Sequence, residues 1–292
     1  MTRSLAFPLP LASLALLGLT ACATAPGEGG DLAAAETANP DVALADAETR
    51  EAADRAPPLE RANFWAGEYA KDPSDPEATL RFGEALRAIG SFDRVIEIAT
   101  QTLVLHPNNG ALHLLKGRAH MALGQPELAV NAFNRASSND PMNPAAYANL
   151  GLALDKVGQH RRAQSAYERA LEIDPDRSAT RSNYGLSLAL SGSLARAEAE
   201  LRAAAAAPDA TSTIRQNLAL VLGLRGDFDA MVEASQDAPD AVVEQNIAVL
   251  KALKGDGVLM ESADRSETGE DQEDGDGEGL SLRGALDDIG VR

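Results

Sequence analysis

Glycine recurs at a fixed interval of 34 residues through most of this sequence. One series follows that interval without interruption, at Gly90, Gly124, Gly158, Gly192 and Gly226. A second series lies seven residues upstream, at Gly83, Gly117, Gly151 and Gly185, with Ala219 in the next slot. A fixed period of this length indicates a solenoid, in which similar supersecondary units stack one on the next.

The clearest unit spans residues 144–175 and reads as two helices. Tyr147, Leu150 and Leu154 fall on one helical face, because they are separated by three, four and seven residues. Gly158 interrupts this pattern, and a second helical face follows it. The second face ends at a proline, which cannot extend a helix. Small residues at the crossing allow the two helices to approach closely, so each unit is predicted to be a helix hairpin.

The unit resembles the tetratricopeptide repeat. The family pattern is a bulky residue, Leu-Gly, an aromatic residue, Ala, an aromatic residue, Ala and Pro. Here it is Tyr147, Leu150, Gly151, Leu154, Ala163, Tyr167, Ala170 and Pro175. Five units match in one register, and the outer two match less well. The resemblance implies an all-α, right-handed solenoid of about five helix-hairpin repeats with half-repeat caps.

The same register sets the expected boundaries. The repeat domain covers residues 59–254. It begins with a cap helix at 59–72, where Trp65 takes the place of a second-helix aromatic residue. The repeats then occupy residues 76–109, 110–143, 144–177, 178–211 and 212–238, and a closing helix follows at 240–254.

The negative charge lies mostly outside the repeats. The net charge is −18, to which residues 23–61 contribute nine acids and three bases, and residues 255–292 twelve acids and three bases. We expect residues 22–58 to be a disordered tether and residues 255–292 a disordered acidic tail. Near the end, Leu282, Leu286 and Ile289 are helically spaced, which fits either an inconsequential helix or a docking peptide. Without a basic stripe, the chain is not expected to bind nucleic acid.

The N-terminus reads as a secretory signal at residues 1–21. Arg3 supplies the positive charge, and residues 5–19 are apolar but too short and too proline-rich to span a membrane. The ending Leu19-Thr20-Ala21-Cys22 resembles a bacterial lipobox, which implies that Cys22 carries acyl chains and anchors the protein. Ala23, rather than Asp, then implies the periplasmic face of the outer membrane. The alternative is an ordinary signal peptide cleaved near Ala21.

The sequence holds no recognisable catalytic motif and no paired cysteines. His113 and His120 lie seven residues apart on one expected helix. Both occupy positions that pack in the family, so we expect structural roles and no metal. We therefore predict neither an enzyme nor a bound cofactor.

A line of asparagines follows the repeat, at Asn149, Asn183, Asn217 and Asn246. In the resembled family this position faces the concave groove, where an amide can pair with the backbone of a bound peptide. The alternative is that the amides brace the next helix of the array. Further expected groove residues are Leu114, Arg118, Leu152, Leu186 and Leu220.

Residues 1–254 as a whole resemble the TadD-type lipoproteins of tight-adherence (Flp) pilus assembly systems. The likeness rests on the lipobox, the 72–78 segment, the 215–223 segment and its echo at 246–250. It implies a lipid-anchored scaffold that acts as a pilotin for the outer-membrane secretin or binds other pilus components. The alternative is an adaptor for outer-membrane protein assembly or for cell-wall enzymes.

Overall fold

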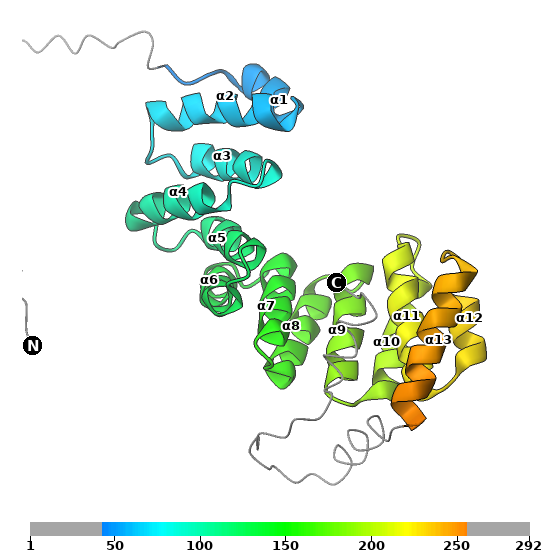
Figure 1. The fold of residues 1–292 in the computed structure, drawn as a ribbon. Helices are drawn as coiled ribbons and strands as arrows, with labels where there is room; N and C mark the ends of the chain where they lie inside the picture. Colours follow the sequence, from blue (N-terminus) through cyan, green and yellow to red (C-terminus); the bar gives the residue numbers. More distant parts are fainter. Residues whose placement is uncertain (1–42, 256–292) are drawn as a thin grey trace, which may run out of the picture. The chain divides into compact units, whose positions relative to one another are not determined.

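The computed structural model describes residues 43–255, and within them every regular element is an α-helix (Figure 1). This confirms the predicted all-α fold. The helices are α1 Ala47–Asp54, α2 Pro58–Lys71, α3 Pro76–Ala88, α4 Phe92–Leu105, α5 Gly110–Ala122, α6 Pro126–Asn139, α7 Pro144–Lys156, α8 His160–Ile173, α9 Ser178–Leu190, α10 Leu194–Ala205, α11 Ser212–Arg225, α12 Phe228–Ala234 and α13 Asp240–Gly255.

Each hairpin turns at a glycine of the uninterrupted series. Gly90, Gly124, Gly158, Gly192 and Gly226 all have φ between 68° and 88°, a left-handed conformation that other residues adopt only with strain. The following amide closes the turn: Gln159 N–H donates to the Leu154 carbonyl at 2.9 Å, and the other four turns repeat this bond. The glycine period therefore fixes where each first helix stops.

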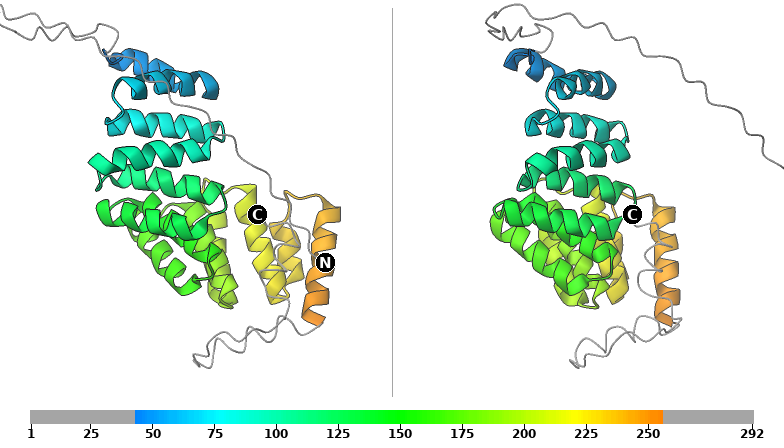
Figure 2. Two further views of the ribbon diagram at one scale, coloured as in Figure 1. Left: turned by 60° about the vertical axis from the view of Figure 1, so that its left-hand side comes forward. Right: turned by 90° about the vertical axis from the view of Figure 1, so that its left-hand side faces the viewer.

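The helices cross where the second glycine series lies. A Cβ atom on Gly151 would stand 2.7 Å from the ring of Tyr167, and one on Gly117 would overlap Phe133. In these two hairpins the aromatic residue of the second helix fills the space that the missing side chain leaves, and in the next hairpin Leu201 takes that place against Gly185. Successive hairpins stack in chain order, since α4 packs on α5, α6 on α7 and α8 on α9 (Figure 2).

The buried side chains form two clusters. One runs from Trp65 on α2 to Ala119 on α5, and the other from Leu114 on α5 to Leu250 on α13. Because the two meet only at α5, no central core joins all the hairpins of residues 43–255. This layered burial is typical of solenoids, where each repeat contacts its neighbours.

The N-terminal boundary differs from the prediction. Residues 22–58 were expected to be disordered, yet Ala47–Asp54 forms helix α1. Asp46 caps it by accepting a 2.8 Å hydrogen bond from the Thr49 amide. α1 has no buried residue of its own, so hydrophobic periodicity gives no sign of it. A polar cluster attaches it to α2 instead.

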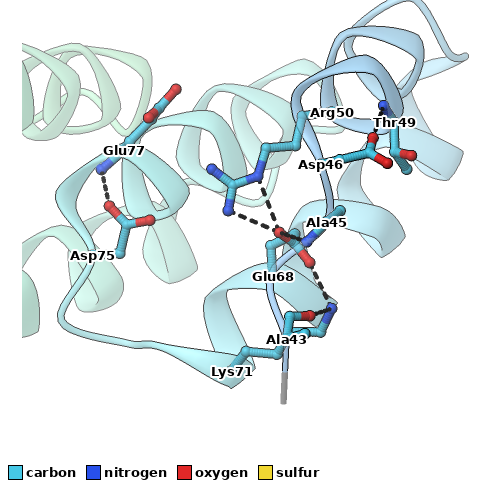
Figure 3. Close-up of polar contacts among 9 residues, drawn as sticks. All are labelled: Ala43, Ala45, Asp46, Thr49, Arg50, Glu68, Lys71, Asp75 and Glu77. Atoms are coloured by element: carbon cyan, nitrogen blue, oxygen red, sulfur yellow. Dashed lines mark hydrogen bonds and ion pairs between the residues drawn. The ribbon is translucent and has the colours of Figure 1, made fainter. Parts of the chain in front are cut away.

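That cluster is centred on Glu68 of α2, which is only 2% exposed (Figure 3). Its carboxylate accepts hydrogen bonds from the Ala45 amide at 3.0 Å, from Arg50 Nη2 at 2.9 Å and from Lys71 Nζ at 2.7 Å. Lys71 also donates to the Ala43 carbonyl at 2.8 Å. Burial opposes ionisation of Glu68, but the donors outweigh it and hold its pKa below the usual value.

At the other end, α12 has only seven residues and α13 packs on α11. Leu250 of α13 is fully buried against this end of the array. None of the helices within residues 43–255 is both long and apolar enough to cross a membrane. Cys22, the signal sequence, most of the expected tether and the acidic tail lie outside the described residues.

Candidate protein-binding groove

A groove runs across α3 and α5, and the repeat period builds it. Leu80 and Glu84 of α3 recur 34 positions later as Leu114 and Arg118 of α5, on the same helical face. These residues line a hollow of about 660 Å³. Its other lining residues are Asp54, Arg61, Glu77, Arg81, Arg87, Ala88, Ala111 and Leu115.

The groove has an apolar floor and charged walls. Leu114 and Leu115 are buried beneath it. Above them, Glu84 joins two arginines: its carboxylate lies 3.0 Å from Arg87 Nε and 3.4 Å from Arg118 Nη1. Burial lowers the pKa of the Arg118 guanidinium, and the charge of Glu84 partly opposes this. The wall is therefore ionic and only partly hydrated.

The end of the groove near α1 holds an unpaired donor. The Nε of Arg61 is buried and has no hydrogen-bond partner among the described residues, while its Nη1 donates to the Asp54 carbonyl at 3.3 Å. Asp54 also pairs with Arg81 at 3.0 Å. A buried donor without an acceptor is unfavourable, so the Arg61 guanidinium is incompletely satisfied at this end of the groove. Arg61 and Asp54 were missed in the sequence, because their contribution depends on the unpredicted α1.

The expected groove residues divide between those that line a hollow, those that are half-buried and one that lies in the core. Leu114 and Arg118 line the hollow, and Leu152 and Leu186 are half-buried on α7 and α9. The assignment of Leu220 is corrected, because this side chain is 5% exposed and, unlike the similarly buried Leu114, does not line the hollow. It is covered because α11 is contacted by α9, α10, α12 and α13 together.

The four asparagines do not act alike. Asn217 is buried and donates to Ser182 Oγ at 3.0 Å, so it braces α11 against α9, and its assignment to the groove is corrected. Asn149 is half-buried and donates to the Ala145 carbonyl of its own helix at 2.7 Å. Asn183 and Asn246 are half-buried and make no side-chain hydrogen bond to any described residue. These two amides keep their full capacity for a ligand.

The histidines make local contacts. His113 Nε2 lies 2.9 Å from the Pro107 carbonyl, and the buried His120 places Nδ1 2.8 Å from Gln125 Oε1. In residues 43–255 no group of three or more His, Cys, Asp or Glu side chains is arranged to hold a metal ion.

Comparison with protein families finds the same repeat. The model of the tetratricopeptide repeat family matches residues 144–177, and a second TPR repeat model matches residues 117–158. The chain has the tetratricopeptide repeat fold. The matched residues cover two hairpins, and the unmatched hairpins share their glycine turns. The hairpin of α9 and α10 also shares the glycine crossing, at Gly185.

Solved tetratricopeptide repeat structures are similar to this chain. YrrB, described as a TPR protein with an unusual peptide-binding site, has a TM-score of 0.51 at 17% identity, over 61% of this chain and 95% of its own. TTC0263 of Thermus thermophilus has a TM-score of 0.49 at 24% sequence identity, over 61% of this chain and 99% of its own. MamA has a TM-score of 0.47 at 24% sequence identity, over 54% of this chain and 84% of its own. No curated protein sequence matches the chain.

Proposed function

We propose that the protein is a scaffold that binds a segment of a partner protein in the groove across α3 and α5. The observation that carries this proposal is the hollow itself, in which a leucine floor lies beside the partly desolvated Arg118 and other charged side chains. Repeat arrays of this type present extended concave surfaces to their ligands.

The chemistry of the groove favours an amphipathic segment with carboxylate groups. Leu80 and Leu114 offer apolar contact, and Arg118 offers a charge that Glu84 engages only at 3.4 Å. The Arg61 side chain, which also lines the hollow and whose Nε lacks an acceptor among the described residues, adds a further positive charge beside the bound segment. YrrB, which shares the fold, is described as having a peptide-binding site, and this supports the same use here.

We propose further that the scaffold is anchored through Cys22 to the outer membrane, on its periplasmic face. Support comes from the lipobox ending at Cys22 and from Ala23 after it. The resemblance to TadD-type lipoproteins supports a role in tight-adherence pilus assembly, with the secretin or another pilus component as partner. The repeat by itself serves many systems, so this step depends on the sequence resemblance.

The groove is tested by photo-crosslinking in living cells. A photoreactive residue replaces Leu80 in the groove, and a matched chain carries it at Leu128, an exposed leucine of α6 outside the hollow. We expect one crosslinked partner from Leu80 and none from Leu128, identified by mass spectrometry as a pilus component. A barrel-assembly or peptidoglycan-enzyme partner would support the alternative adaptor role. Identical products from both positions would contradict the groove.

The anchor is tested separately. Replacing Cys22 with Ser should move the protein from the membrane fraction to the soluble periplasmic fraction, and globomycin should cause the unprocessed precursor of the parent chain to accumulate. Continued membrane association of the Cys22→Ser chain would refute the anchor and leave the groove proposal untouched.

A further inference from the structure

A second hollow, of about 420 Å³, lies on α7 and α8 away from the groove. Its apolar side consists of Tyr147, Leu150 and Leu154 from α7. Its other side is formed by Arg161, Arg162, Ser165, Ala166 and Arg169 from α8. Three arginines line it and no acidic residue does, so we call it the arginine pocket.

The pocket is specific to this repeat. In the register of the array, Arg161 occupies the position held by Asp93, Glu127 and Asp229 in three other repeats. Arg169 pairs with Glu172 at 2.8 Å and places its guanidinium 5.9 Å from the ring centre of Tyr147. The ring therefore holds this arginine over the pocket.

The local structure of α8 does not favour these charges. The helix begins His160-Arg161-Arg162, and its first turn has no acid. Its cap residue Gln159 makes no capping hydrogen bond, and the Gln159 side chain instead accepts an exposed hydrogen bond from Arg162. The N-terminal end of a helix carries partial positive charge, so two arginines there oppose the helix dipole. α4, α6 and α12 place Asp or Glu in the same turn. An anionic ligand in the pocket would lie beside the partial positive charge of this helix end and beside the three guanidinium groups.

The chain contains an acidic segment whose charge is opposite to that of the arginine pocket. Residues 270–278 have six acids among nine positions and no base, and they follow the last described helix. The distance from the last described helix to the pocket follows from the packing of the helices. Three neighbouring pairs lead from α13 to α8, namely α13 with α11, α11 with α9 and α9 with α8. Packed helix axes lie about 8–10 Å apart, so the distance between α13 and α8 is about 30 Å. The fourteen residues 256–269 extend to about 45 Å, so the segment reaches the pocket.

We propose that residues 270–278 bind the arginine pocket of the same chain. A tethered segment has an effective concentration in the millimolar range, so even weak binding in cis keeps the pocket occupied. An external acidic ligand must then compete with the tail. The inference does not depend on the groove across α3 and α5, because the two hollows share no lining residue.

The test uses the full mature chain with Cys22→Ser and a fluorescent peptide of residues 268–280. In a tail-neutral chain, the six acids of 270–278 are replaced by Asn or Gln. We expect the peptide to bind the tail-neutral chain at least tenfold more tightly than the parent chain, and to dissociate as salt is raised. Equal binding to both chains would overturn the proposal.

The pocket residues have matched controls. Arg161→Gln, Arg162→Gln and Arg169→Gln together should weaken peptide binding to the tail-neutral chain at least tenfold. Arg94→Gln and Arg135→Gln, which change the equivalents of Arg162 and Arg169 in other repeats, should leave it unchanged. Circular dichroism checks that both sets keep the helical content. Equal effects of the two sets would contradict the pocket.

Hydrogen exchange gives a readout that needs no arginine variant. The first two turns of α8 should be more protected in the parent chain than in the tail-neutral chain, independently of protein concentration. Protection that grows with concentration would refute binding in cis. A different result would assign the pocket to a lipid surface and overturn the proposal. In that case the protein would sediment with phosphatidylglycerol vesicles, lose this sedimentation when the three arginines are replaced, and fail to bind the peptide.

Discussion

At the scale of single residues, the array depends on a large side chain packed against a glycine where helices cross, and at Gly117 and Gly151 that side chain is an aromatic ring. Gly151 faces Tyr167, whose side chain is fully buried and whose hydroxyl has no hydrogen-bond partner among the described residues. Burial raises the pKa of that hydroxyl well above its usual value, and the nearby Asp155 carboxylate adds to the effect. The ring is thus fixed by packing and has little freedom to move aside.

We therefore expect Gly151→Ala to destabilise the array. The new Cβ would stand 2.7 Å from the Tyr167 ring, and relieving such overpacking costs about 1–3 kcal/mol. Chemical denaturation followed by circular dichroism measures the change. Gly67→Ala is the control, because no atom lies within 4 Å of the new Cβ. It should stabilise α2 by about 0.5–1 kcal/mol, and a loss comparable to that of Gly151→Ala would contradict the packing argument.

Residue patterns also set the limit of the sequence prediction. The repeat period identified Leu114 and Arg118 as groove residues, because register fixes the helical face. The same register assigned Leu220 and Asn217 to the groove, yet both are buried and neither lines the hollow. The repeat register does not show how many helices pack against a given face. α11 is contacted by four helices, whereas α3 is contacted by three and is more open.

At the scale of elements, hairpins were predictable and α1 was not. Every hairpin follows from a glycine turn and two apolar faces, whereas α1 offers neither. Its attachment depends on the buried Glu68, and an isolated glutamate in an amphipathic sequence normally indicates a solvated position. Only the structure reveals that Arg50, Lys71 and a backbone amide converge on it.

The pKa of Glu68 makes the attachment of α1 sensitive to acid. The pKa of Glu68 is lower in the folded protein than its unfolded value of 4.5. The ionised carboxylate therefore contributes its full stabilisation of the α1 attachment above pH 4.5, and this stabilisation is lost as the pH falls through the folded-state pKa. Trp65 reports the change, since its Nε1 donates to Asp54 of α1 at 2.9 Å and it is the only tryptophan. We expect its fluorescence to shift to the red below pH 4.5.

Glu68→Gln should reproduce that change at neutral pH. It removes the charge that Arg50 and Lys71 share, which costs the attachment about 1–3 kcal/mol. The red shift should then appear at lower denaturant concentration than in the parent chain. Glu60→Gln, on the exposed side of α2, is the control and should leave the transition in place. Coincident transitions in the Glu68→Gln chain and the parent chain would show that the cluster does not hold α1.

The first turn of α8 gives a second prediction at this scale. Arg162→Glu places a negative charge near the helix N-terminus and should stabilise the array by about 0.5 kcal/mol in thermal unfolding. The equivalent change in α10, Arg196→Glu, should destabilise it, because Arg196 donates to Tyr184 Oη at 2.8 Å in a part-buried position, whereas the bond from Arg162 to Gln159 Oε1 is exposed. If the array becomes more stable when Arg162 is replaced, this arginine does not serve folding, which supports a role in binding a ligand at the arginine pocket. Destabilisation by Arg162→Glu would remove this support for the arginine pocket.

At the scale of the whole chain, two clusters that meet only at α5 predict local unfolding. Ile98 of α4 belongs to the first cluster and Leu201 of α10 to the second, and both are fully buried. Replacing either with Ala leaves a cavity that costs about 2–5 kcal/mol. In a globular core that loss would spread everywhere, whereas in an array it acts on adjacent repeats. Ile98→Ala should therefore speed hydrogen exchange in α2 to α5 and leave α9 to α11 nearly unchanged, and Leu201→Ala should do the reverse. Equal acceleration along the whole array in both chains would mean that the hairpins unfold as one unit, and that a ligand on α3 and α5 stabilises the distant arginine pocket as well.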